Sequence, residues 1–218
     1  MQDKPPAIRA VILTLVLGVV LAVGLAEVYD VAALLTGDGR LGAVTVNTGL
    51  AALPVFLWWR QRSGPATAGG LWPWLPALTV FGAVVGAALI SSGGQPTGAL
   101  PGPRALIWIL WVPVVEEWVF RAGFGLWFRR RLGVIAGCWT SALFFSLMHS
   151  LPVRDRILSG AAGFLPGPFL LGLACEVILV RSGRLLPAIA LHMVCNLSGP
   201  LFGYLDPRWL EWLGYLYL

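Results

Sequence analysis

The sequence predicts an all-α fold, a polytopic membrane helix bundle with about seven transmembrane helices and a short C-terminal segment that is interfacial or half-spanning. Three observations support this prediction. Of the 218 residues, 58% are hydrophobic and 11% are charged, whereas soluble domains contain about 45–50% apolar and about 25% charged residues. The mean hydropathy is +0.81. Seven apolar stretches approach the ~20 residues that a helix needs to cross a bilayer.

The predicted spans follow one another within a single integral membrane domain, residues 1–218. Gly, Pro and charged residues interrupt the apolar sequence between them and mark the loops. The first span follows Lys4 and Arg9 and resembles a signal peptide. Its apolar run is longer than such peptides contain, so we expect it to be retained. The tail after residue 206 is too short to span. The spans cover approximately residues 10–28, 41–59, 71–92, 105–128, 133–149, 161–180 and 185–205.

Basic residues give the chain a net charge of +5, and they are scattered through short loops without forming a basic stripe. This distribution predicts topology signals and contacts with lipid headgroups, and it argues against binding of nucleic acid. With the N-terminus in the cytoplasm, nine Lys and Arg residues fall in inside loops and five in outside loops. Because cytoplasmic loops carry the excess of basic residues, we predict a multi-pass protein with a cytoplasmic N-terminus.

Few ionisable residues lie inside the predicted spans. A charge near the bilayer centre costs about 2.5–3.5 kcal/mol on insertion scales, so such residues are expected to be paired or functional. Glu176 lies near the end of the sixth span, where we expect it at the inner interface and paired with Arg181 or Arg184. Both histidines of the chain belong to the polar set inside the spans, which consists of Glu116, Glu117, Arg121, His149, Glu176, His192 and Asn196.

Helical spacing separates the two adjacent acids. Residues four apart share one face of a helix, so Glu117 and Arg121 are expected to form an ion pair whose role is mainly structural. Glu116 points about a quarter turn away and lacks such a partner. A carboxylate without a counter-ion in a low-dielectric site suits a general base that works near neutral pH.

The same spacing places Phe145 with His149, and His192 with Asn196, on one face of their respective helices. Together with Glu116, these faces could converge on one cavity from three helices. Taken singly, each His or Asn could instead be a hydrogen-bonding residue of helix packing. Their joint occurrence favours a catalytic site or a transport pathway.

Three motifs in this set resemble those of a known family. Residues 116–121, EEWVFR, resemble the EExxxR motif of the CPBP family, the CAAX protease and bacteriocin-processing group that is also called Abi. Residues 145–149 are similar to its FxxxH motif, and residues 192–196 are similar to its HxxxN motif. The motifs occur in the family's order, and each lies in a predicted span. The resemblance covers about residues 105–200, the predicted catalytic core.

The resemblance implies an intramembrane endopeptidase of the glutamic type that needs no cofactor. Glu116 would be the general base that activates water, assisted by His149. His192 and Asn196 would stabilise the oxyanion of the tetrahedral intermediate. The remaining motif residues would support the site, namely Glu117, Arg121 and Phe145.

The partners that the resemblance implies are the lipid bilayer and a peptide or protein substrate with a membrane-embedded or C-terminal anchor segment. Family members that cleave prenylated CAAX proteins are usually longer and have eight spans. The compact chain is more similar to bacterial members, so we expect it in the bacterial inner membrane.

Alternative functions remain open at the level of sequence. Glu116, His149 and His192 form a His2Glu set of the kind that holds catalytic zinc, although no HExxH motif is present. Intramembrane Glu and His also serve in transporters and proton relays, but inverted repeats and paired broken helices are not visible in the sequence. A non-catalytic scaffold would be expected to lack a motif residue, and none is missing.

Overall fold

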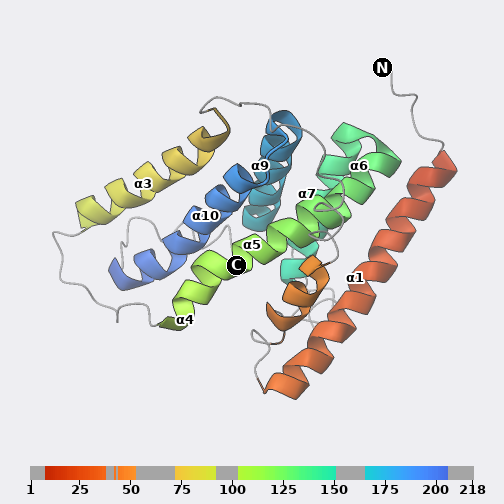
Figure 1. Ribbon diagram of the computed structural model, residues 1–218, viewed down its shortest axis with the longest axis horizontal. Helices are drawn as coiled ribbons and strands as arrows, with labels where there is room; N and C mark the ends of the chain where they lie inside the picture. The colour runs from red at the N-terminus through yellow and green to blue at the C-terminus, as the bar shows by residue number, and fades with distance from the viewer. Residues whose placement is uncertain are drawn as a thin grey trace.

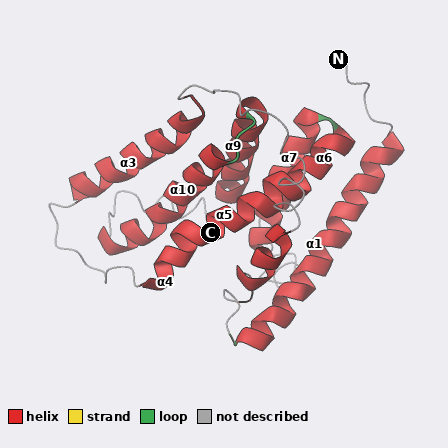
Figure 2. Ribbon diagram, viewed as in Figure 1, coloured by secondary structure: helices red, strands yellow, loops and turns green. Residues whose placement is uncertain are grey.

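The structure is a computed structural model that describes residues 8–37, 42, 44–52, 72–91, 103–150 and 165–205. These residues form helices and the turns between them, and no strand occurs among them (Figure 2). The all-α prediction is therefore confirmed for the described part of the chain. Residues 53–59 of the second predicted span, the start of the sixth and the tail after residue 205 lie outside it.

The N-terminal helix α1, Ile8–Thr36, lies along one side of the molecule (Figure 1). It ends at Gly37, whose φ of 68° is readily adopted only by glycine. A second helical stretch, residues 44–52, returns between α1 and the centre of the molecule. The Tyr29 hydroxyl donates a 2.5 Å hydrogen bond to Asn47 Oδ1, which joins the two helices.

The centre of the molecule is one continuous helical run from residue 103 to residue 132. It comprises α4 (Pro103–Leu106), η2 (Ile107–Trp111), α5 (Val112–Glu117), η3 (Trp118–Gly125) and α6 (Leu126–Leu132), and both η2 and η3 are π-helical. Pro113 has no N–H to donate to the preceding turn, which accounts for the widened turn of η2. π-helical turns are uncommon and frequently occur at functional sites, and here they flank the two adjacent acids.

The remaining helices pack around this central run (Figure 1). Helix α7 (Val134–Ser150) follows Gly133, whose φ is 81°, and contacts both α6 and α9 (Pro166–Ser182). Helix α9 ends at Gly183, which is left-handed and donates its N–H to Leu179 O at 2.8 Å. Helix α10 (Leu186–Leu205) packs against α9 and α3 (Leu75–Ser91), and the short helix η1 (Trp72–Trp74) precedes α3.

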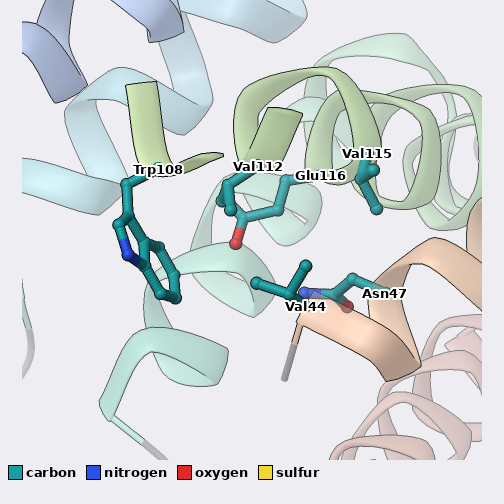
Figure 3. Close-up of a pocket in the computed structure, with 6 residues that line it drawn as sticks. All are labelled: Val44, Asn47, Trp108, Val112, Val115 and Glu116. Carbon is teal, nitrogen blue, oxygen red and sulfur yellow. The ribbon is translucent and has the colours of Figure 1, made fainter. Parts of the chain in front are cut away.

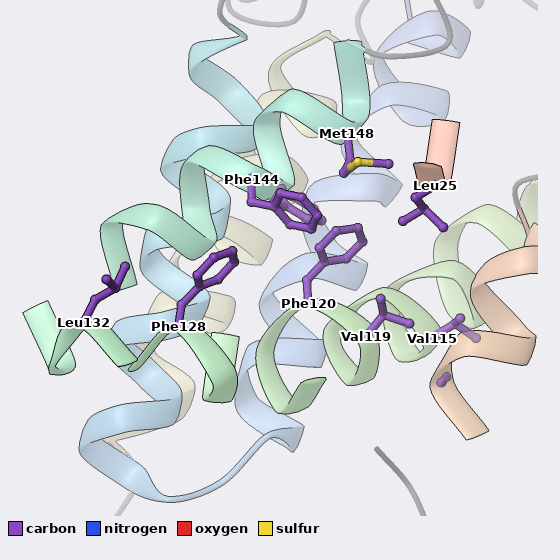
Figure 4. Close-up of a cluster of buried hydrophobic side chains, with 10 residues drawn as sticks. Leu25, Val115, Val119, Phe120, Phe128, Leu132, Phe144 and Met148 are labelled. Carbon is purple, nitrogen blue, oxygen red and sulfur yellow. The ribbon is translucent and has the colours of Figure 1, made fainter. Parts of the chain in front are cut away.

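An aromatic core lies between η3, α6 and α7 (Figure 4). The ring centroid of Phe144 lies 6.0 Å from that of Phe120 and 5.7 Å from that of Phe128. Phe145, which is fully buried, continues the core toward the acids with its centroid 5.1 Å from that of Phe120. Burying an aromatic side chain stabilises the folded state by about 1.5–3 kcal/mol, so this core fixes the position of the central run against α7.

No helix in the described ranges combines the length and the hydropathy expected of a membrane span. The number of transmembrane helices therefore stays a prediction.

Candidate active site

Three separate helices bring the predicted site residues together. Glu116 and Glu117 end α5, with Arg121 following in η3. Helix α7 contributes Phe145 and His149, and α10 contributes His192 and Asn196. The predicted convergence is observed at Glu116, since His149 Nε2 of α7 and His192 Nε2 of α10 each come within 4 Å of its carboxylate on α5.

Glu117 and Arg121 form the predicted ion pair. Arg121 Nε donates to Glu117 Oε2 at 3.1 Å and Arg121 Nη2 donates to Glu117 Oε1 at 3.4 Å, and both side chains are fully buried. Glu117 Oε1 also lies 3.0 Å from His192 Nδ1, a contact that sequence spacing within one helix could not predict. Glu117 therefore links the central run to α10 as well as neutralising Arg121.

Glu116 differs from its neighbour in its surroundings. It is 9% exposed, and its Oε2 atom is buried without a hydrogen bond in the described part of the chain. Oε2 lies 3.6 Å from His192 Nε2 and 3.9 Å from His149 Nε2, which is beyond hydrogen-bonding distance. The prediction that Glu116 is not committed to Arg121 is confirmed, and two imidazole nitrogens face the same carboxylate oxygen.

The charges of this cluster balance only with one additional proton. Two carboxylates and one guanidinium leave a net charge of −1, and an unbalanced buried charge costs several kcal/mol. A proton on Glu116 or on His192 restores neutrality, and the two groups face each other through Oε2 and Nε2. The geometry therefore suits proton exchange between a carboxyl group and an imidazole.

The ring of Phe145 packs against His149, His192 and Arg121. Its ring centroid lies 4.3 Å from that of His149 and 5.7 Å from that of His192, in an edge-on arrangement with the latter. The Arg121 guanidinium carbon lies 4.4 Å from the same centroid, within the range of a cation–π contact. One aromatic ring thus contacts both histidines and the buried arginine.

Asn196 contacts the backbone of the central run. Its Nδ2 atom donates to Trp108 O at 2.9 Å. In η2, Val112 donates its N–H to Ile107 O, and Pro113 carries no N–H. The Asn196 amide thus supplies a donor to a carbonyl at which regular helical bonding is interrupted. An amide nitrogen carries two hydrogens, so one remains for another acceptor.

A pocket lies beside Glu116 (Figure 3). Its cavity measures about 20 Å³ for the centre of a water molecule, and ~10–15 Å³ suffices for one water. In Figure 3 the Glu116 carboxylate points into the space between Trp108 and Asn47. The walls consist of Val44, Asn47, Trp108, Val112, Val115 and Glu116.

Residues 98–198 match the family model described as type II CAAX prenyl endopeptidase Rce1-like. The Rce1-like segment contains all three motifs and thereby supports membership in the CPBP group, and Rce1-like proteins are membrane-embedded proteases. No curated protein and no solved structure gives a significant match to the chain.

Within the Rce1-like segment, Glu176 does not have the surroundings expected from the sequence. It is fully buried and pairs with Arg129, so the expected pairing with Arg181 or Arg184 is wrong. Ser141 donates a 2.5 Å hydrogen bond to Glu176 Oε1. The physical reason is that a full turn of α9 separates Glu176 from its C-terminus, so the carboxylate faces α6 and α7.

This second buried cluster holds the backbone of η3. Arg129 Nη2 donates to Arg121 O at 3.2 Å. The Ser141 hydroxyl also lies 3.2 Å from Phe120 O, so its single hydrogen can serve either that carbonyl or Glu176 Oε1. A side chain at Gly125 would collide with the Glu176 carboxylate, so only glycine allows this approach. The cluster therefore fixes the π-helical backbone that carries Arg121.

Metal ligation was an open alternative for the Rce1-like segment. Across the described ranges, no three or more His, Cys, Asp or Glu side chains are arranged to hold a metal ion.

Proposed function

We propose that the protein is an intramembrane endopeptidase that hydrolyses a peptide bond in a membrane-associated peptide or protein precursor, with water activated by Glu116. The observation that carries this proposal is the position of the Glu116 carboxylate. It lines a cavity large enough for one water molecule, and the Nε2 atoms of His149 and His192 lie within 4 Å of its Oε2 atom. Membership in a family of proteases supports the same conclusion.

In the proposed reaction, Glu116 removes a proton from the bound water, and the water oxygen attacks the carbonyl carbon of the scissile bond. The tetrahedral intermediate then collapses, the C–N bond breaks, and the proton held by Glu116 passes to the leaving amine. A positioned base of this kind contributes about 10²–10⁴-fold to a rate. An uncommitted carboxylate is available for both proton transfers.

His149 is placed to assist Glu116. Its Nδ1 atom lies 2.8 Å from Phe145 O, and a carbonyl oxygen only accepts hydrogen bonds, so Nδ1 carries the hydrogen. In the neutral ring Nε2 then presents a lone pair, and this atom faces Glu116 Oε2. His149 can therefore take up a proton close to the base. Its side chain is 33% exposed, which offers a path for that proton to leave.

His192 and Asn196 are proposed to stabilise the oxyanion. Glu117 accepts from His192 Nδ1, so His192 can donate from Nε2 only when the ring is protonated. Asn196 offers its second amide hydrogen. Two such donors aimed at developing negative charge lower the barrier to acyl transfer.

The proposed environment is a bacterial inner membrane, with the N-terminus in the cytoplasm. Many large apolar side chains on described helices face outward, for example Leu34 at 84% and Ile135 at 79% exposure. Extended apolar surface of this kind marks contact with lipid or protein. The proposed substrates carry a membrane-embedded or C-terminal anchor segment, and the matched family description makes a prenylated CAAX peptide the first probe to use.

The test is cleavage by the purified protein reconstituted in liposomes. The probe is a fluorogenic peptide that ends in a farnesylated CAAX sequence, with its unlipidated form and an apolar single-span peptide as further probes. Glu116→Gln should lower the rate about 10²–10⁴-fold, while Glu27→Gln, the same change at an exposed site on α1, should not. Cleavage of every accepted probe by Glu116→Gln at the normal rate would contradict the proposal.

The zinc alternative makes a different prediction in the same assay. Glu116, His149 and His192 would have to move together to hold the ion, because no such group in the described ranges is arranged to bind a metal. Removal of metal by a chelator would then abolish cleavage, and zinc would restore it. The metal-free reaction predicts an unchanged rate after chelation.

A further inference from the structure

A polar side chain outside the Rce1-like segment reaches the pocket beside Glu116. Asn47 lies on the helical stretch 44–52, and the matched family segment begins at residue 98. Asn47 is 7% exposed, and it lines the same pocket as Glu116 (Figure 3). The family motifs assign no role to this residue.

The orientation of the Asn47 amide is set by Tyr29. The Tyr29 hydroxyl donates to Asn47 Oδ1 at 2.5 Å, so the oxygen of the amide is occupied and the nitrogen is directed to the other side. Asn47 Nδ2 makes no hydrogen bond to another described residue. The amide oxygen is fixed by Tyr29, and the amide nitrogen keeps its hydrogens for other acceptors. Such a nitrogen is suited to donating a hydrogen bond to an acceptor in the pocket.

The chemistry of the pocket calls for such a donor. A buried water needs two to four polar partners. Glu116, when ionised, can only accept hydrogen bonds, and the walls otherwise present apolar surface from Val44, Val112 and Val115 together with the indole of Trp108. Asn47 is the pocket side chain that carries a pair of amide hydrogens.

We propose that Asn47 is a water-positioning residue for the reaction of Glu116. Its Nδ2–H donates to the oxygen of the bound water, and one hydrogen of that water points to the Glu116 carboxylate. The second lone pair of the water oxygen then faces the substrate carbonyl. As Glu116 takes the proton, this lone pair forms the new C–O bond. The inference rests on the proposed function, because it assigns a role at the same site.

A merely structural role makes a different prediction. Intramembrane Asn residues often hold helices together through hydrogen bonds, and the bond with Tyr29 joins two helices in this way. Loss of that role would lower thermal stability without a specific effect on turnover. Loss of water positioning lowers kcat and leaves KM nearly unchanged, because the substrate keeps its own contacts.

The test compares four variants in liposomes with the farnesylated fluorogenic peptide. Asn47→Ala removes the amide, and Asn47→Asp keeps its shape but removes the donor. Tyr29→Phe removes the hydroxyl that orients the amide. Thr48→Val is the matched control, because Thr48 lies next to Asn47 on the same helix and accepts a hydrogen bond from Trp111 Nε1 at 3.2 Å instead. Thermal unfolding is recorded for each variant.

We expect kcat to fall at least about 10-fold in Asn47→Ala and Asn47→Asp, with a smaller fall in Tyr29→Phe, since misplacement of a reacting group costs up to about 10²-fold. KM should stay within about twofold, and Thr48→Val should behave as the unmodified protein. If Asn47→Ala fails to fold, the kcat values of Asn47→Asp, which is isosteric with the unmodified side chain, and of Tyr29→Phe test the role of Asn47.

Normal kcat in Asn47→Asp and Tyr29→Phe, with Glu116→Gln inactive, would overturn the role of Asn47 and leave the proposed function standing. A rise of KM in these two variants without a fall in kcat would also overturn the role of Asn47. Normal cleavage by Glu116→Gln would overturn the proposed function, and the role of Asn47 would fall with it.

Discussion

Glu117 Oε1 lies 3.0 Å from His192 Nδ1, while the same carboxylate group holds Arg121 through a 3.1 Å contact. The second acid of the adjacent pair therefore serves two buried partners on different helices. This relationship gives Glu117 a function beyond neutralising the arginine, because it sets which nitrogen of His192 faces Glu116.

Replacing Glu117 by glutamine should separate these two roles. Glutamine keeps an oxygen that can accept from His192 Nδ1, but it removes the negative charge beside the ring. We expect kcat to fall about 10–100-fold, as is usual when the orienting partner of a functional histidine is changed. The measurement is kcat for the farnesylated peptide, compared between Glu117→Gln and Glu27→Gln. Equal kcat values for the two variants would show that the charge of Glu117 plays no part.

Replacing Arg121 by alanine should mainly reduce stability. The change leaves Glu117 buried with its charge unbalanced and removes the cation–π contact with Phe145. Breaking a buried ion pair by removing one partner costs about 3–5 kcal/mol. Thermal unfolding in detergent and the yield of folded protein are the measurements. A variant that is as stable as the unmodified protein yet inactive would contradict the structural role.

Replacing Glu176 by alanine should also destabilise the protein. The change leaves Arg129 without its buried counter-ion and removes an acceptor of Ser141, so the Arg129 guanidinium that donates to the Arg121 carbonyl of η3 is no longer held in place. We expect a loss of about 3–5 kcal/mol, with a smaller loss for Glu176→Gln, which keeps the acceptor. Chemical unfolding checks this order. Equal stability of Glu176→Ala and the unmodified protein would show that the cluster is not needed to hold η3.

Replacing Asn196 by alanine should disturb the site through the backbone. The Trp108 carbonyl loses a donor at the point where Pro113 interrupts helical bonding. Losing this part-buried hydrogen bond costs about 0.5–1.5 kcal/mol, and the proposed oxyanion donor is lost at the same time. Both stability and kcat should therefore fall. A fall in stability with unchanged kcat would limit Asn196 to a packing role.

The sequence predicted those parts of the site that depend on helical spacing. The ion pair of Glu117 and Arg121 lies one helical turn apart, so periodicity alone indicates it. The convergence of residues from α5, α7 and α10 was predicted because intramembrane polar residues are too costly to stand alone. The motifs then matched a family, which the comparison of residues 98–198 confirmed.

The remaining features depend on contacts between distant parts of the chain. Glu176 pairs with Arg129 across 47 positions, and Asn196 reaches Trp108 across 88. Neither distance has a periodic signal in the sequence. Asn47 escaped notice because it lies in a predicted span without a motif. The π-helical turns could have been suspected only at Pro113, where a backbone donor is missing.

The most direct test of the central claim is the cleavage rate of Glu116→Gln in liposomes, measured beside Glu27→Gln with the farnesylated CAAX peptide, its unlipidated form and the apolar single-span peptide. Glutamine keeps the shape of the side chain but cannot take a proton from water. The account predicts that Glu116→Gln loses at least about 10²-fold in rate on every peptide that the unmodified protein cleaves, with thermal unfolding unchanged. Cleavage at the rate of Glu27→Gln would contradict it.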